Sequence, residues 1–398
     1  MPASRLRIGI DGRSIGRPNG TGVATYASIL AQACRQRGWQ AERVIDAPPD
    51  TAVGPTHSLA AKLGRFRSAI PRSRTAMPIM FEGDPAWLSS DLFRIAHVHF
   101  GLYRRLLALH MADPPTVMHW TYPLPLRLPG VPNLVTVHDL IPLLEPALTD
   151  IAAVRMERLL RATISQAACV VTVSETVRAD IVRRLGVAPD RVVNLYQAVD
   201  LPVPSRDMPV PCPPDSFLCV GSIERRKNIG RLIAAHGRSG SCRMLVLIGP
   251  DGDHAAAELT ALSAHPNPDR VLRLPWIARP ALVQAMRLAR ALVFPSLAEG
   301  FGLPIAEAMT LGTPVITSRG GATEEIAGGA ALLADPLDIG ELAGAMSSLD
   351  QDDGLYARLA VAGRARARLF SIEAYGERLD RLYRQVVAGS LPVPAGIT

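Results

Sequence analysis

A proline-rich stretch near the middle of the chain separates two similar patterns of short apolar runs. Residues 201–215 read LPVPSRDMPVPCPPD, and their six prolines exclude a helix there. On either side, apolar runs that predict buried strands alternate with amphipathic runs that predict helices. Such alternation is typical of parallel sheets with helices on both faces. The sequence therefore predicts an α/β protein with two Rossmann-like, doubly wound parallel-sheet domains, residues 1–200 and 216–370, joined by a linker at 201–215.

The 398 residues of the chain are enough for about two domains. Ligands of doubly wound sheets bind at the carboxyl ends of the strands, so two such domains are expected to face a central cleft. The last predicted helix, residues 371–388, carries an apolar stripe along one side. We expect residues 371–398 to cross back and pack on the N-terminal domain. Residues 47–90 are rich in proline, arginine and serine and are expected to be irregular.

The composition, with 48% hydrophobic and 20% charged residues, is that of a globular enzyme. Because no run of about 18 apolar residues occurs, we expect no membrane-spanning helix. The chain also enters a strand-like run directly, without the pattern of a signal peptide. Its five cysteines are scattered and form no CxxC pair, which indicates a reducing compartment and no structural zinc. A cytoplasmic protein is therefore expected.

The formal net charge of +7 favours anionic partners: nucleotide diphosphates, a lipid surface or nucleic acid. Only 5% of the residues are aromatic and no nucleic-acid-binding motif is present, so nucleic acid is not an expected partner. Four arginines lie close together in the first domain, namely Arg65, Arg67, Arg72 and Arg74. They could contact anionic lipid at the inner face of the cell membrane, at about 1 kcal/mol each, or form a solvated loop. Both interpretations remain open.

The segment PSLAEGFGLPIAEAM, residues 295–309, contains a Gly-Phe-Gly turn. An apolar run before it predicts a strand, and Pro304 suits the first position of a helix. Gly300 and Gly302 therefore lie between a strand and a helix. Such a turn directs bare backbone N–H groups at whatever lies above the helix start, where the helix dipole also favours an anion. A diphosphate fits this description.

Two glutamates, Glu299 and Glu307, stand on either side of this turn. An acid/base pair of the glycosidase kind needs carboxyl groups roughly 5–9 Å apart, and the spacing does not exclude it. Ordinary helix surface is a second interpretation, because glutamates near the start of a helix are stabilising. The phosphate-binding turn between them favours a third, in which the two carboxylates bind hydroxyls of a sugar and a ribose.

A cluster of cations follows the first strand predicted after the linker. The segment VGSIERRKNI, residues 220–229, places Arg225, Arg226 and Lys227 immediately before a helix. Like charges at a strand end repel one another unless an anion is present. Lysine is a compact point charge that can reach phosphate oxygens, and arginine binds them with a fork. A solvated charged turn is the alternative.

The segment NGTGV, residues 19–23, opens the first predicted helix of the chain. Gly20 and Gly22 would let a ligand approach the start of this helix. The segment matches the first part of the dinucleotide fingerprint GxGxxG, but Thr25 stands at the third glycine position. The loop that begins at Asp11 is also too long for a tight Rossmann turn. Binding of NAD is therefore poorly supported.

A histidine and an aspartate, His138 and Asp139, follow another strand predicted in the first domain. A lone histidine is more often structural, but a His-Asp pair at a carboxyl strand end, in a cleft already rich in anion sites, is also a candidate functional pair. No second histidine or cysteine lies nearby in the sequence, so a metal site is poorly supported.

Together these motifs resemble the retaining glycosyltransferases of family 4, which use nucleotide-sugars and have the GT-B fold. VGSIERRKN, EGFGLPIAE, AMTLGTPVITS and AALLADP occur in the order of that family. In the first domain, NGTGVATY and TVHDLIPL resemble members that build sugar polymers. The chain looks most like mannosyltransferases of bacterial polysaccharide biosynthesis. The resemblance implies transfer of a hexose, with mannose from GDP-mannose as the leading assignment, to a glycan or lipid-linked acceptor.

The resemblance also implies roles for residues of the second domain. Glu299 would bind hydroxyls of the donor sugar, and Glu307 would bind the ribose. Arg226 and Lys227 would neutralise the diphosphate, so that no metal cofactor is needed. Backbone amides of the turn, at Phe301, Gly302 and Leu303, would bind phosphate and sugar oxygens.

In the first domain, His138 would contact the transferred sugar near its anomeric carbon, with Asp139 among the substrate-binding residues. Gly20 and Gly22 would line the phosphate side. Arg225 departs from the family, where proline is frequent. Two other interpretations remain: a sugar-nucleotide epimerase on the same fold, and a non-catalytic subunit that binds a nucleotide-sugar.

Overall fold

The structure, a computed structural model, describes residues 6–15, 22–46, 68–202 and 208–390. Within these residues the first domain contains an eight-stranded sheet in the order β11-β10-β9-β7-β1-β2-β5-β4. All neighbouring strands are parallel except β4 and β5, which are antiparallel. The strands are β1 (Arg7–Asp11), β2 (Gln40–Ile45), β4 (Met77–Phe81), β5 (Asp84–Leu88), β7 (Val117–Trp120), β9 (Asn133–Val137), β10 (Cys169–Thr172) and β11 (Val192–Asn194).

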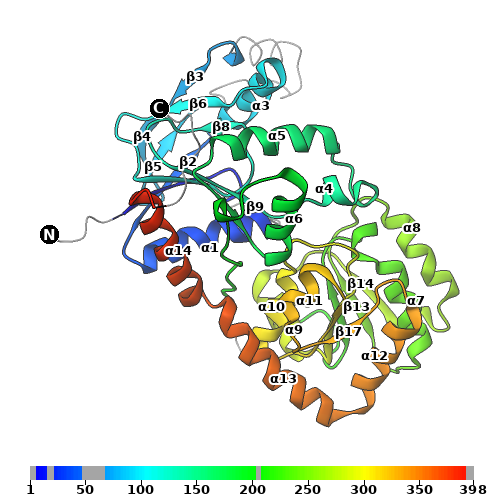
Figure 1. Ribbon diagram of the computed structural model, residues 1–398. Coiled ribbons are helices and arrows are strands. Elements are labelled where there is room, and N and C mark those ends of the chain that lie inside the picture. The colour runs from blue at the N-terminus through cyan, green and yellow to red at the C-terminus, as the bar shows by residue number, and fades with distance from the viewer. Residues whose placement is uncertain (1–5, 16–21, 47–67, 203–207, 391–398) are drawn as a thin grey trace.

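Helices and a small second sheet complete the first domain (Figure 1). The second sheet is parallel and consists of β3 (Ser73–Thr75), β6 (Leu107–His110) and β8 (Leu126–Arg127). The helices are α1 (Gly22–Gln36), α3 (Leu92–Tyr103), α4 (Ile141–Leu144), α5 (Ala153–Gln166) and α6 (Glu175–Leu185). Helix α6 shows why such elements form at these positions: Ser174 caps its first turn and Gly186 ends it in the left-handed conformation.

The second domain is built on a six-stranded sheet in the order β14-β13-β12-β15-β16-β17, parallel throughout. Its four central strands are buried along their whole length, as expected for a sheet covered on both faces. The strands are β12 (Phe217–Val220), β13 (Leu245–Ile248), β14 (Val271–Leu274), β15 (Ala291–Phe294), β16 (Val315–Ser318) and β17 (Leu332–Ala334). The helices are α7 (Ile229–Ser239), α8 (Ala255–Leu259), α9 (Arg279–Leu288), α10 (Leu303–Leu311), α11 (Gly321–Ala327), α12 (Ile339–Gln351) and α13 (Asp353–Ala367). The α/β class with two parallel-sheet domains is confirmed.

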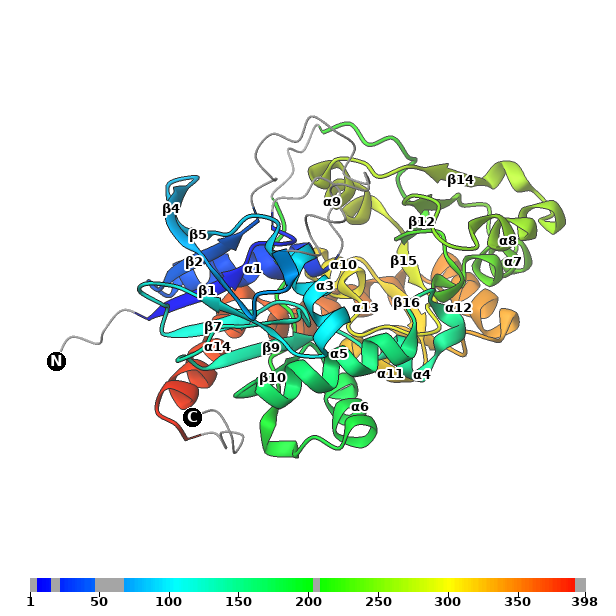
Figure 2. The ribbon, with the colours of Figure 1, turned by 90° about the horizontal axis from the view of Figure 1, so that it is seen from above.

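The C-terminal helix α14 (Ile372–Val387) returns to the first domain and runs beside α1 (Figures 1 and 2). Its apolar stripe is buried there. Tyr375 lies edge-on to Tyr26 of α1, with ring centroids 6.3 Å apart. Tyr383 contacts Trp39 and is hydrogen-bonded through its hydroxyl to Nδ1 of His119, at 2.7 Å. The chain therefore passes between the domains twice.

The structure contains several elements that the sequence pattern did not predict. Residues 73–88, expected to be irregular, contain β3, β4 and β5. These strands are short and β4 includes Pro78, so they lack the alternating pattern by which strands are recognised. The alternating pattern also did not place the helices α3, α4, α11 and α13. Among the residues that the structure describes, no helix is both long enough and apolar enough to cross a membrane.

Candidate active site

A cavity of about 800 Å³ lies between the two domains, at the carboxyl ends of strands from both sheets. Its size is in the range usual for small-molecule sites. Loops that follow β9, β12 and β15 line it, together with the start of α1. Of the residues predicted from the sequence, the lining contains Gly22, His138, Asp139, Arg226, Lys227, Glu299, Phe301, Gly302, Leu303 and Glu307. Gly20 lies outside the described residues.

The Gly-Phe-Gly turn leads from β15 into α10. Gly302 has φ +93° and precedes the helix, and no side chain caps the first backbone N–H groups. At Gly300, an added Cβ would stand 1.8 Å from the carbonyl oxygen of His138, so only glycine fits. Phe301 is buried against Phe370, with ring centroids 5.4 Å apart. The turn therefore presents backbone N–H groups to the cleft from a rigidly packed position.

Two cations meet the carboxylate of Glu299 in the cleft. Its Oε1 lies 2.8 Å from Nη1 of Arg226 and 2.6 Å from Nζ of Lys227. Burial raises the pKa of Glu299, but the two cations outweigh burial and the pKa is lowered from its usual value. Arg226 also pairs with Glu224 at 2.6 Å, and the Lys227 ammonium lies over the ring of Phe294 at 4.5 Å. These contacts hold both cations against the turn.

Glu307 lies on α10 and is 2% exposed. Its Oε1 forms an ion pair with Nη2 of Arg279, from the first turn of α9. Burial raises the pKa of Glu307, and Arg279 opposes the effect. Arg279 also lines the cavity but was not identified from the sequence, because 28 residues separate it from Glu307 and no motif surrounds it. The pair fixes the orientation of a carboxylate that lines the cavity from the second domain.

On the opposite wall, His138 is hydrogen-bonded through Nε2 to the carbonyl oxygen of Thr121 at 2.9 Å. A carbonyl can only accept, so Nε2 carries the proton and Nδ1 is an acceptor. Burial lowers the pKa of His138 to about 4, which keeps the ring neutral near pH 7. Tyr26 meets the ring edge-on, with centroids 4.9 Å apart. His138 is thus oriented to accept a hydrogen bond rather than to supply a proton.

Asp139 follows on the same loop, and its Oδ1 accepts a hydrogen bond from the backbone nitrogen of Ile141 at 3.0 Å. Burial raises the pKa of Asp139, and the charge of Arg226, which belongs to the other domain, lowers it. The loop that carries His138 and Asp139 therefore lies close to the cation cluster of the second domain.

Two contacts between the domains border the cleft. The hydroxyl of Ser174 donates to the carbonyl oxygen of Gly300 at 2.7 Å. The carboxylate of Glu325 on α11 accepts hydrogen bonds from the backbone nitrogens of Glu175 and Thr176, at 2.7 and 2.8 Å. Glu325 thereby binds the start of α6 across the domain boundary, where the helix dipole favours an anion. These contacts hold the two walls of the cleft together.

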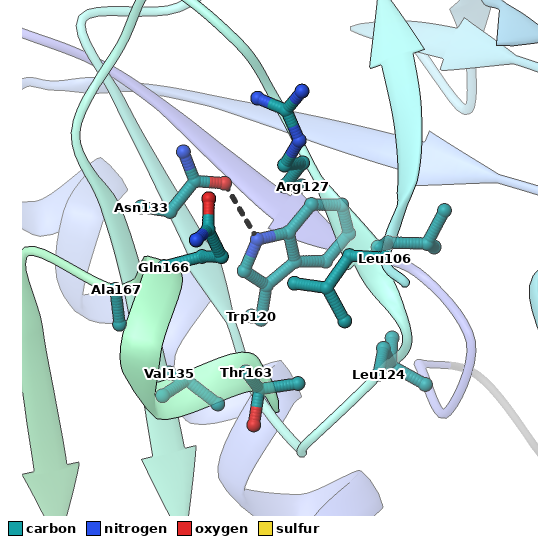
Figure 3. Close-up of a pocket in the computed structure, with 10 residues that line it drawn as sticks. Leu106, Trp120, Leu124, Arg127, Asn133, Val135, Thr163, Gln166 and Ala167 are labelled. Carbon is teal, nitrogen blue, oxygen red and sulfur yellow. Dashed lines mark hydrogen bonds between the residues drawn. The ribbon is translucent and has the colours of Figure 1, made fainter. Parts of the chain in front are cut away.

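A second, much smaller cavity of about 10 Å³ lies inside the first domain (Figure 3). Trp120 is one of the residues that line it and donates a hydrogen bond from Nε1 to Oδ1 of Asn133 at 2.9 Å. The space is about that of one water molecule, so it is not a substrate site. Among the described residues, no group of three or more His, Cys, Asp or Glu side chains is placed to hold a metal ion.

Two Rossmann-like domains that face each other across a cleft form the GT-B architecture. In this protein the cleft also contains clustered cations and a helix start without a side-chain cap. Solved structures agree. The sucrose-phosphate synthase of Thermosynechococcus elongatus superposes with a TM-score of 0.70 at 21% identity, over 97% of this chain and 100% of that one. Anabaena HepE in complex with UDP and glucose gives a TM-score of 0.66 at 16% identity, over 96% and 100%. At these identities the likeness shows the fold.

Sequence comparison gives the family. Residues 20–202 match the description "Glycosyltransferase Family 4", and residues 209–366 match "Glycosyl transferases group 1". Since the two matches occupy most of the chain, this protein belongs to the family 4 glycosyltransferases of GT-B fold.

Curated relatives include the O-antigen chain mannosyltransferase B of Escherichia coli, 31% identical over 232 residues, which are 55% of this chain and 61% of that protein. The O-antigen chain mannosyltransferase RfbU of Salmonella typhimurium is 29% identical over 217 residues, or 54% and 60% of the two chains. The chain thus spans about 60% of the length of these relatives.

Proposed function

We propose that this protein is a retaining hexosyltransferase that moves a sugar from a nucleotide-sugar to a glycan or lipid-linked acceptor in surface-polysaccharide biosynthesis. GDP-mannose is the leading donor, because the named relatives are mannosyltransferases of O-antigen chains. The observation that carries the proposal is the position of Arg226 and Lys227, held by Glu299 against the uncapped start of α10.

This arrangement suits departure of a diphosphate. As the bond to the anomeric carbon breaks, negative charge grows on the leaving group and an oxocarbenium-like charge grows on the sugar. Fixed cations and bare N–H groups stabilise the leaving group without having to reorganise. Arg226 would bind phosphate oxygens with its fork, and Lys227 would supply a compact charge. A divalent ion is then unnecessary, and we propose that catalysis is metal-independent.

The remaining residues would orient the donor. The carboxylate of Glu307, fixed by Arg279, would accept hydrogen bonds from the ribose hydroxyls. Glu299 would bind hydroxyls of the sugar as well as the two cations. His138, neutral and with Nδ1 as an acceptor, would bind the sugar near the anomeric carbon. The acceptor hydroxyl would attack from the leaving-group face and give its proton to a phosphate oxygen of the donor, which accounts for retention.

The location of the acceptor is proposed more broadly. The protein would work in the cytoplasm, with a peripheral contact to the inner face of the membrane where its acceptor is carried. Of the arginine cluster expected to contact lipid, Arg65 and Arg67 lie outside the described residues. Arg74 donates a hydrogen bond to the carbonyl oxygen of Ser90 at 3.0 Å, and Arg72 is exposed. Arg74 is thus tied to the fold, and Arg72 is the described arginine of the cluster that is exposed to meet a lipid surface.

The experiment begins with thermal shifts of the protein against GDP-, UDP- and dTDP-sugars in the presence of EDTA. We expect GDP-mannose to raise the unfolding temperature. In a transfer assay, we expect the protein to add mannose to an alkyl α-mannoside through an α-linkage, which NMR identifies. Lys227→Met should retain the fold and lose most of the transfer, because half of the fixed cationic pair is removed. Arg319→Met, at a surface ion pair with Glu341, is the control.

Other outcomes would contradict the proposal in distinct ways. No shift with any nucleotide-sugar would exclude the donor site itself. An isomerised sugar formed without acceptor would indicate an epimerase, and binding without transfer to any glycan acceptor would indicate a binding subunit. Loss of activity in EDTA would overturn metal independence, and full activity of Lys227→Met would overturn the diphosphate assignment.

A further inference from the structure

Gln197 follows β11 and begins the first crossing between the domains. Its side chain is 3% exposed, yet it lines the interdomain cavity. Its amide nitrogen, Nε2, is buried and has no hydrogen-bond partner within the described part of the chain. Several other buried side-chain atoms there also lack a partner, but Gln197 is the residue among them that lines the cavity. The cavity wall therefore contains a hydrogen-bond donor without an acceptor among the described residues.

Such an orphan is costly for the folded state. Nearly all buried polar groups in proteins are hydrogen-bonded, and a buried donor without a partner is destabilising. A leucine or methionine at position 197 would fill similar space without that penalty. Nε2 lacks an acceptor, and an oxygen of a ligand bound in the cleft would supply one.

The surroundings of Gln197 fix its position relative to the Gly-Phe-Gly turn. Tyr196, in the left-handed conformation at φ +56°, directly precedes Gln197 in the chain. Its ring packs edge-on against Phe370 of the second crossing at 5.6 Å, and Phe370 packs against Phe301 of the turn at 5.4 Å. The backbone nitrogen of Val199 donates to the carbonyl oxygen of Phe370 at 2.8 Å. A short packed unit therefore connects Gln197 to the turn at which the diphosphate is proposed to bind.

We propose that Gln197 is a donor-binding residue: its Nε2 group donates a hydrogen bond to an oxygen of the nucleotide-sugar, from the first domain, opposite the N–H groups of the turn between Gly300 and Leu303. This inference rests on the proposed function, since the oxygen belongs to the sugar-diphosphate. Gln197 then contacts the donor from the first domain, while the cations contact it from the second. The bound donor therefore links both domains.

The test is the substitution Gln197→Met, which keeps the length of the side chain and removes the amide. Affinity for GDP and for GDP-mannose is measured by calorimetry, with the thermal unfolding of the ligand-free protein recorded beside it. We expect the dissociation constant of GDP-mannose to rise by about 10- to 100-fold if the acceptor is a charged phosphate oxygen, and by about 2- to 10-fold if it is a sugar hydroxyl. If Nε2 binds the diphosphate, GDP weakens equally; if it binds the sugar, only GDP-mannose weakens.

The ligand-free protein provides the second readout. Because Gln197→Met removes an unpartnered buried donor, its unfolding temperature should stay equal to the wild type or rise. A structural glutamine would behave in the opposite way, with a lower unfolding temperature and unchanged affinity, and that result would overturn the proposal. Unchanged affinity together with unchanged stability would also overturn it, since the amide would then contribute nothing to donor binding.

A matched control and the wild type separate this inference from the proposed function. Gln32→Met makes the same chemical change on α1, where Nε2 of Gln32 donates to Asp200 at 2.8 Å beside the same crossing. It should leave both affinities unchanged. If the wild type binds no nucleotide, the proposed function fails; if the wild type binds and Gln197→Met binds equally well, only the present inference fails.

Discussion

Glu307 is a carboxylate kept in a buried position by a counter-ion from a different helix. Burial alone raises its pKa, and the guanidinium of Arg279 favours the ionised form that a hydroxyl-binding site requires. Without Arg279, Glu307 would be an unpaired buried charge, which is strongly destabilising. Without Glu307, Arg279 would still be hydrated by solvent, because its side chain is 39% exposed. The pair is thus better suited to orienting Glu307 than to stabilising the fold.

We predict that Glu307→Gln, which keeps the shape and removes the charge, weakens GDP binding by about tenfold or more. Hydrogen bonds from hydroxyls to a charged acceptor are worth about 1.5–3 kcal/mol, and a neutral amide accepts less strongly. Calorimetry with GDP measures the change. With 2′,3′-dideoxy-GDP the wild type and the variant should bind alike, and a difference that persists there would contradict the ribose role. Glu258→Gln on α8, outside the cavity lining, is the control.

Among the secondary-structure elements, the turn between β15 and α10 lies directly against loops of the first domain. The carbonyl oxygen of His138 fills the space where a side chain on Gly300 would be, and Ser174 holds the carbonyl of the same glycine. The glycine therefore serves close approach between domains as well as the shape of the turn.

We expect Gly300→Ala to abolish most of the transfer activity, because its Cβ would push the His138 loop away from the turn. Activity and radius of gyration by X-ray scattering measure the effect, and we expect a more open molecule. Gly344→Ala on α12 is the matched control: no atom lies within 4 Å of the added Cβ, and alanine in a helix is favoured by up to about 1 kcal/mol. Normal activity of Gly300→Ala would exclude the close approach in solution.

The sequence predicted well those features that a short segment encodes. The turn at residues 299–303 could be found because an apolar run, two glycines and Pro304 follow one another within a short segment. Arg279 and Glu325 could not, because their partners are 28 and about 150 residues away and neither lies in a recognisable pattern. Gln197 was also missed, since its importance lies in a hydrogen bond that the protein does not make.

The same physical reason applies to whole elements. The four central strands of the second domain are fully buried, and apolar runs are the kind of segment from which the sequence predicted strands. Helix α13 has buried and exposed residues without a strong stripe, and the β4–β5 hairpin is an exposed edge with little alternation. Their places are set by packing against elements formed elsewhere in the chain, which a single-sequence pattern does not report.

For the molecule as a whole, the relative position of the domains depends on direct contacts near the cleft, among them those of Glu325. Glu325 makes three of them, to the backbone nitrogens of Glu175 and Thr176 and to the hydroxyl of Thr176 at 2.6 Å. A carboxylate at a helix N-terminus is favoured by the helix dipole and by charge-assisted hydrogen bonds. Because these bonds can form only when the walls are together, they favour the closed arrangement.

We predict that Glu325→Gln shifts the molecule toward an open arrangement without unfolding either domain. A glutamine can accept from one backbone nitrogen, but its own amide group faces the other, so about 1–3 kcal/mol of closure energy is lost. The radius of gyration of the ligand-free protein should increase, and saturating GDP-mannose should bring it back toward the wild-type value, because a ligand that binds both walls favours closure.

Glu324→Gln, one residue earlier on α11 and bonded to Gly320 of its own domain at 2.5 Å, should leave the radius unchanged. If both variants scatter like the wild type, closure does not depend on Glu325, and the packed unit of Tyr196, Phe370 and Phe301 is then sufficient to hold the domains together.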